Sequence, residues 1–162
     1  MFYRQASNQY INEGTQFEID GQTFPPQWLN QSTPEQKAAL GLVEVVATNQ
    51  PFDPVYYWTG ETLDKATLTY TGTPKDLVEV QNNAVSSVRS SAYALLLPSD
   101  WMAVKAFETS APMNADWSAW RASIRQTAAD TVTAIQACTT VDEVANVMSN
   151  ITWSQDPNNT GV

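Results

Sequence analysis

The chain has 162 residues, with eight Lys or Arg, seventeen Asp or Glu, and a formal net charge of −9. This length supports one domain, or two small subdomains. Nucleic acids and anionic membrane surfaces attract clustered cations, and the sequence has no basic run, so neither is an expected partner. A hydrophobic fraction of 43% favours a folded chain over a disordered one.

Residues 1–72 are predicted to form a small antiparallel β subdomain with one short helix. Residues 16–20 alternate apolar and polar side chains, as a half-buried strand does. The turn at Asp20-Gly21 favours a return strand at 23–24.

A short helix and a strand follow in this half. Thr33 is expected to cap the helix, with Pro34 at its first position, and Gly41 ends it. Residues 42–46 then predict a strand. A proline-bearing loop and an aromatic strand over 49–60 precede a further strand pair around the Gly60 and Gly72 turns. The N-terminal half is therefore expected to contain a sheet of two to four antiparallel strands.

Residues 73–153 are predicted to be helical and to form a bundle of three to four helices. Thr73 and Pro74 are expected to start the first helix, and Pro98 to end it. The second begins at Ser99-Asp100.

Two further helices complete the predicted bundle. The third opens at Asn114 or Asp116, and Thr140 with Glu143 forms a capping box for the fourth. Residues 154–162 have little apolar surface to bury, and we expect a tail that is flexible or ordered by a partner.

Several apolar positions are candidate interface residues. Tyr56 and Trp58 share one face of the predicted aromatic strand, where they would pack in a core or an interface, or stack on a carbohydrate. One stripe of the first C-terminal helix carries apolar side chains, opposite uncharged polar ones. This stripe would pack against the other helices or against a neighbouring chain, including a second copy, and its interface candidates are Leu77, Val80, Ala84 and Val88.

The sequence offers little catalytic chemistry. It contains no histidine and one cysteine, Cys138, which excludes Ser-His-Asp and Cys-His catalysis and a thiolate zinc cluster. No phosphate-binding or calcium-binding motif occurs. We therefore predict no catalytic residue, no cofactor and no metal. Cys138 is expected to be a buried helix residue or to pair with a cysteine of another chain.

Two carboxylate pairs leave a glycosidase as the least favoured hypothesis. Glycoside hydrolysis requires two carboxyl groups about 5–10 Å apart in a cleft. The nearest pairs are Glu18 with Asp20 and Asp142 with Glu143. Turn chemistry explains the first pair and helix capping the second.

Short motifs resemble those of small proteins encoded with tailed-phage tail-fibre and baseplate genes. In the first half they are Phe24-Pro25-Pro26-Gln27-Trp28-Leu29, Thr33-Pro34-Glu35 and Leu40-Gly41-Leu42-Val43-Glu44-Val45. In the second half they are Ser99-Asp100-Trp101, Trp117-Ser118-Ala119-Trp120-Arg121 and Trp153. Trp120 stands where the family has Tyr, and the capped helix from Thr140 replaces a proline-rich ending.

The resemblance implies fibre components or fibre-assembly proteins without catalytic residues. We therefore expect a non-enzymatic structural component of a phage virion, with fibre or baseplate proteins or a second copy as partners. The chain would be made in the host cytoplasm and reach the phage tail by assembly. The alternative is a tail-fibre assembly chaperone that acts transiently.

Overall fold

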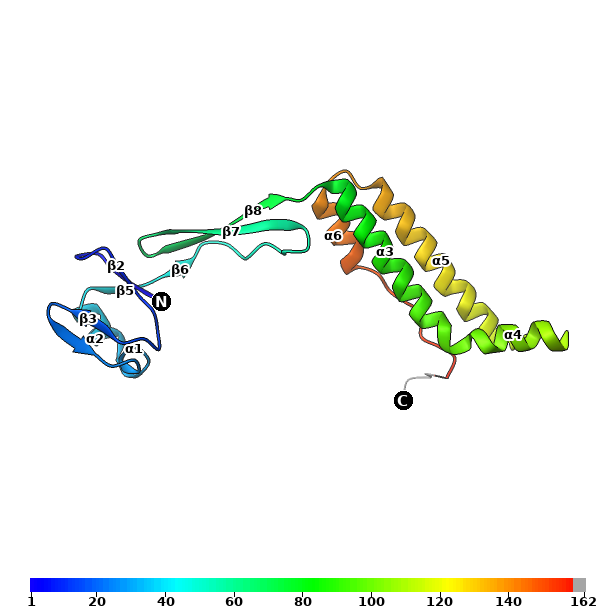
Figure 1. Cartoon of the computed structure of the whole chain (residues 1–162), viewed down its shortest axis with the longest axis horizontal. Coiled ribbons are helices and arrows are strands. Elements are labelled where there is room, and N and C mark those ends of the chain that lie inside the picture. The colour runs from blue at the N-terminus through cyan, green and yellow to red at the C-terminus, as the bar shows by residue number, and fades with distance from the viewer. Residues whose placement is uncertain (159–162) are drawn as a thin grey trace. The chain divides into compact units, whose positions relative to one another are not determined.

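The computed structural model describes residues 1–158 and divides the chain into two compact units, Met1–Thr73 and a second unit that begins at Pro74. The first unit contains β-strands and two short helices, and the second is helical (Figure 1). The α+β class predicted from the sequence is confirmed.

A three-stranded antiparallel sheet lies at the start of the first unit. Strand β1 (Phe2–Arg4) is central, between β2 (Gln9–Ile11) and β5 (Leu42–Glu44). Phe2 pairs with Ile11 on one side and with Glu44 on the other. The N-terminal segment is therefore part of the sheet, although the sequence patterns did not predict β1 and β2 individually.

A hairpin and a tryptophan complete the first hydrophobic core. Strands β3 (Phe17–Ile19) and β4 (Gln22–Phe24) pair antiparallel, and Asp20 and Gly21 between them have φ angles of 51° and 80°. Such angles suit the tight turn that the sequence predicted. Phe17 and Phe24 stack at 5.0 Å, and the Trp28 ring meets both rings edge-on. The buried members of this core are Phe2, Ile11, Phe17, Ile19, Phe24, Leu29 and Leu42.

Two short helices connect the hairpin to β5. Trp28 and Leu29 belong to α1 (Trp28–Gln31), a helix that the sequence did not predict. Helix α2 (Pro34–Ala39) has the predicted capping box, in which the Thr33 hydroxyl accepts from the Gln36 amide and the Gln36 side chain accepts from the Thr33 amide.

The rest of the first unit is a ribbon of three strands, β6 (Val46–Ala47), β8 (Thr67–Pro74) and β7 (Tyr57–Asp64), in that order. Strand β6 runs parallel to β8, a departure from the antiparallel sheet expected. The Asn49 side chain extends this pairing because it bonds both the N–H and the carbonyl of Tyr70, each at 2.8 Å. No ribbon residue reaches full burial.

The start of the first long helix differs from the prediction. Thr73 and Pro74 lie in β8, and Asp76 caps α3 (Leu77–Leu96) by accepting from the Glu79 amide at 2.9 Å. The predicted Thr-Pro start is therefore wrong by three residues. Thr73 and Asp76 each carry a side-chain oxygen that can accept a capping hydrogen bond before the apolar stripe. Because Thr73 belongs to strand β8, Asp76 is the residue that caps the helix.

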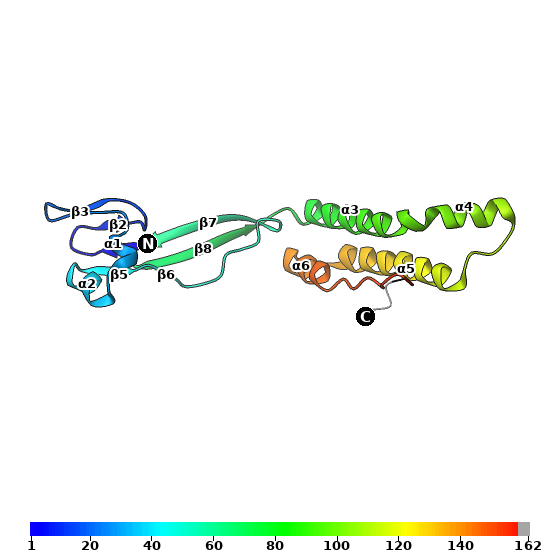
Figure 2. The same ribbon diagram turned by 90° about the horizontal axis from the view of Figure 1, so that it is seen from below.

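Three helices pack together in the second unit (Figure 2). Helix α3 contacts α5 (Ala115–Ala137) and α6 (Val141–Ser149), and α5 also contacts α6. Their buried apolar side chains are Val80, Ala84, Val88, Ala92, Trp120, Ile124, Ile135, Val141 and Val144. This packing forms the second core.

A 3-10 turn (Leu97–Ser99) joins α3 to α4 (Asp100–Thr109), which continues beyond the three packed helices and has no buried residue. The bundle thus contains three mutually packed helices and a fourth that projects from them (Figure 1).

The segment after α6 begins against the bundle. Trp153 packs on the core cluster of Ala92, Trp120 and Ile124, and the Trp120 indole donates to the Ser154 carbonyl at 2.9 Å. The start of the predicted tail is therefore anchored. Residues 159–162 of that prediction lie outside the described residues.

Candidate interaction surface

The direction of α4 is fixed by one buried arginine. Arg121 of α5 is only 6% exposed. Its guanidinium donates to the Leu96 carbonyl at 2.9 Å, to the Ser99 hydroxyl, and to the Asp100 carboxylate at 2.6 Å. These acceptors all lie at the corner between α3 and α4. A charged group buried this deeply needs such partners, so the contacts tie the corner to α5.

The corner itself stays close to helical geometry. Leu97 and Asp100 both have αR backbone angles, and Ser99 departs only to φ −106° and ψ 2°. Helix α4 therefore continues from α3 with a change of direction (Figures 1 and 2).

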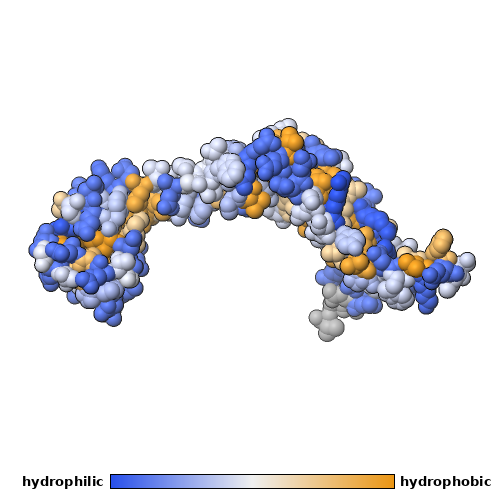
Figure 3. All heavy atoms as spheres, in the orientation of Figure 1, coloured by the Kyte–Doolittle hydropathy of each residue, from blue (hydrophilic) through white to orange (hydrophobic). Residues whose placement is uncertain are grey.

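An unpartnered apolar surface runs along this continuous helical path. We call it the exposed stripe, and its members, with their exposed fractions, are Tyr93 (63%), Leu97 (51%), Trp101 (57%), Val104 (55%) and Phe107 (88%). Tyr93 and Leu97 are four residues apart at the end of α3, and Trp101, Val104 and Phe107 are three residues apart on α4, spacings that place side chains on one side of each helix. Apolar residues gather on α4 in the space-filling view, at the right of Figure 3.

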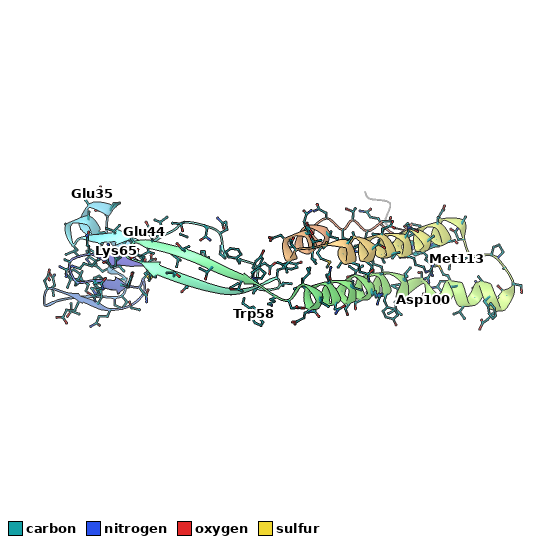
Figure 4. All side chains as sticks on the ribbon, turned by 90° about the horizontal axis from the view of Figure 1, so that it is seen from above. Glu35, Glu44, Trp58, Lys65, Asp100 and Met113 are labelled. Atoms are coloured by element: carbon teal, nitrogen blue, oxygen red, sulfur yellow. The ribbon has the colours of Figure 1, made fainter. Side chains whose placement is uncertain are left out.

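A groove borders the stripe on the other side of α4. It has a volume of about 350 Å³ and lies between α4, the loop that returns from it and the start of α5. Met113 lies on this loop and Asp100 at the start of α4 (Figure 4). Apolar side chains dominate its lining, among them Trp101, Met102, Ala106, Pro112, Met113 and Trp117. The ring of Trp101 therefore belongs to both the groove and the stripe.

The sequence-predicted stripe of α3 has a different location. Val80, Ala84 and Val88 are buried in the chain's own bundle, and Leu77 is half-buried. The neighbouring Gln81 amide donates to the Ile135 and Cys138 carbonyls at 2.9 and 3.0 Å, which holds this side of α3 against the end of α5. The burial of the first three leaves little surface there for another chain.

Tyr56 and Trp58 belong to the first unit. Tyr56 lies just before β7 and is half-buried, and burial, aided by the nearby Asp53 carboxylate, raises the pKa of its hydroxyl. Trp58 lies in β7 and is 68% exposed. Figure 4 labels Trp58, whose side chain extends from strand β7. Only Trp58 of this pair presents a large open surface.

Cys138 follows the last residue of α5. Its thiol donates to the Ala134 carbonyl at 3.2 Å, and the residue is half-buried. Burial, followed by the neighbouring Glu143 carboxylate, raises the pKa of this thiol. Both effects disfavour the reactive thiolate.

Structural contacts engage Asp20 and Glu143, two of the four carboxylates weighed for catalysis. Asp20 accepts from Arg4 at 2.6 Å. Glu143 accepts from the Thr139 and Thr140 amides at 2.6 and 3.2 Å, and these bonds, with that from the Thr139 hydroxyl, lower the pKa of its carboxyl. Asp142 lies beside Glu143 in the first turn of α6. Within residues 1–158, no group of three or more acidic, Cys or His side chains is placed to hold a metal ion.

None of the described helices is long and apolar enough to cross a membrane. Sequence reasoning missed the exposed stripe because it placed the interface candidates of this half on the α3 stripe that begins at Leu77 and at Cys138, and gave no interface role to Trp101, Val104 and Phe107. A signal was available, since Tyr93, Leu97 and Trp101 repeat every four residues outside the stripe that begins at Leu77.

The chain was compared with protein-family models, with curated proteins and with solved structures, and none of these matches it.

Proposed function

We propose that the chain is a non-enzymatic structural component of a tailed-phage virion, in the tail-fibre or baseplate region, that acts through protein–protein assembly. Helix α4 carries the proposal, because it has no buried residue although it presents Trp101, Val104 and Phe107. Soluble monomers rarely leave a contiguous apolar patch of this kind exposed, and such patches mark interaction sites. Helix α4 is thus a surface for another protein.

The location in the phage tail rests on the motif resemblance. Several of the residues that resemble the phage proteins support the architecture. Phe24 and Leu29 are core residues of the first unit, and Ser99, Asp100 and Arg121 form the corner that aims α4. The motifs therefore account for how the chain presents its surface, and the chain would reach the virion after synthesis in the host cytoplasm.

Mass spectrometry of purified phage particles tests the proposal. We expect the chain in particles at a fixed ratio to fibre or baseplate proteins. Absence from particles, with abundance in the lysate, would overturn the structural role. If the yield of folded fibre then rose on co-expression with this chain, the transient assembly chaperone would replace it.

A further inference from the structure

We infer that a second copy of this chain docks on the exposed stripe and forms a two-fold dimer with Trp101 near the axis. This inference rests on the proposed function, because it names the partner of the same assembly surface. It places the dimer contact on the outer side of α3 and α4 and leaves the buried stripe of α3 inside each copy.

The order of side chains along the stripe is self-complementary. From Tyr93 to Phe107 it reads aromatic, aliphatic, aromatic, aliphatic, aromatic, and this order is the same in both directions. A two-fold interface brings one patch against itself, so such an order suits it. With antiparallel helices crossing at Trp101, Tyr93 of one copy lies toward Phe107 of the other, and Leu97 lies toward Val104.

The corner places the stripe on two helix directions. Within α4 a rise of 1.5 Å per residue puts Phe107 about 9 Å from Trp101. Tyr93 lies on α3, on the other side of the Leu97–Ser99 turn. Trp101, at the start of α4, therefore lies between the two ends of the stripe.

The exposed area matches the requirement of a stable pair. Fully exposed aromatic side chains offer about 150–250 Å² each, so the three on the stripe and its two half-exposed aliphatic residues supply roughly 500–700 Å² per copy. Two copies would then bury roughly 1,000–1,400 Å², at the lower end of specific protein interfaces. A small hydrophobic dimer is consistent with this area.

The charges on this side of the molecule permit self-association despite a net charge of −9 per copy. Between Glu79 and Asp100 the only charged residue is Arg89, and Asp100 is held by Arg121. In the antiparallel arrangement Glu108 of one copy lies toward α3 of the other, where Arg89 is the nearest charge. Asp100 lies next to Trp101 near the axis, but its carboxylate is paired with Arg121 in each copy, so the axis brings together two ion pairs and not two unpaired carboxylates.

Sedimentation of the purified full-length chain over a wide range of concentration tests the dimer. We expect a reversible monomer–dimer equilibrium. Trp101→Ser should raise the dimer dissociation constant by at least about 30-fold, the effect of removing an interface hot spot. Trp58→Ser is the matched control, because Trp58 is similarly exposed but lies in the first unit, and we expect it to leave the constant unchanged.

Circular dichroism and thermal unfolding verify that both variants fold. A monomer at all concentrations, a higher closed oligomer, or a dimer lost in Trp58→Ser but kept in Trp101→Ser would each overturn the inference. A monomeric chain that is nevertheless present in particles would overturn the dimer and leave the proposed function standing. A Trp101-dependent dimer that is absent from particles would overturn the proposed function and leave the dimer standing.

Discussion

At the residue scale, Arg121 joins the two features on which the account depends, the bundle and the direction of α4. Its guanidinium reaches three acceptors at the corner, and Ser99 beside it is 1% exposed. The Asp100 side chain remains 46% exposed, so solvent screens that ion pair. Most of the stabilisation therefore comes from satisfying the buried polar atoms.

Arg121→Met should lower the free energy of unfolding by about 2–3 kcal/mol, because the Ser99 hydroxyl and the Asp100 carboxylate lose their Arg121 donor and the Leu96 carbonyl keeps only the Ser99 hydroxyl as a side-chain donor. Arg125→Met removes an exposed arginine from the same helix and should change stability by less than about 0.5 kcal/mol. Urea unfolding of the two variants makes the comparison. Equal losses would contradict the role given to Arg121.

The Glu143 carboxyl makes the stability of the second unit depend on pH. Hydrogen bonds from Thr139 and Thr140 lower the pKa of the carboxyl, so the charged form contributes stability at neutral pH that is lost as pH falls through the folded-state pKa. Glu143→Gln keeps an acceptor and removes the charge. We expect the variant to be less stable than wild type at pH 7, with a difference that narrows below about pH 4. A difference independent of pH, measured by urea unfolding, would refute this.

At the element scale, α4 and α5 behave differently although both carry large apolar residues. The bundle places Ile135 of α5 at 0% exposure, whereas Phe107 of α4 is 88% exposed. Burial in the chain's own core stabilises α5, whereas α4 gains little stability from its apolar residues until a partner covers them.

Phe107→Ser should therefore change the free energy of unfolding of the dilute, monomeric chain by less than about 0.5 kcal/mol. Ile135→Ala should lower it by about 2–5 kcal/mol, through lost burial and the cavity left behind. Urea unfolding at low protein concentration measures both. A large loss in Phe107→Ser would show that α4 is packed within the monomer.

At the scale of the whole molecule, the two units have separate cores. Leu29 is fully buried in the first and Ile124 in the second. The cores share no cluster member, so a cavity in one removes no packing from the other.

Leu29→Ala should accelerate amide hydrogen exchange in the first unit only, and Ile124→Ala in the second only. Hydrogen-exchange mass spectrometry resolves the two, because each local opening reports the stability of its own segment. Exchange that rises throughout the chain in either variant would show one cooperative unit.

Local chemistry made much of this architecture predictable. The Thr33 and Thr140 boxes and the Asp20-Gly21 turn act over a few residues, and the structure has all three. The start of α3 was less accessible, because strand pairing of β8 extends through Pro74 and competes with helix capping.

The location of the candidate surface depends on contacts between helices that are far apart in the sequence, and local sequence patterns do not reveal these contacts. Val80, Ala84 and Val88 show an amphipathic pattern, which is the same for a core face and an interface face. These residues belong to the core because α5 and α6 pack against α3. The exposure of Trp101 and Phe107 likewise follows from the corner at Arg121, where residues more than twenty positions apart meet.

The most direct measurement is the incorporation of stripe variants into phage particles. Host cells would supply wild-type chain with Trp101→Ser, or with Trp58→Ser, during infection, and mass spectrometry would compare each ratio in purified particles with that in the lysate. We predict that Trp101→Ser is depleted from particles and that Trp58→Ser keeps its lysate ratio. Incorporation of Trp101→Ser at the lysate ratio, or the absence of every form from the particles, would contradict the account.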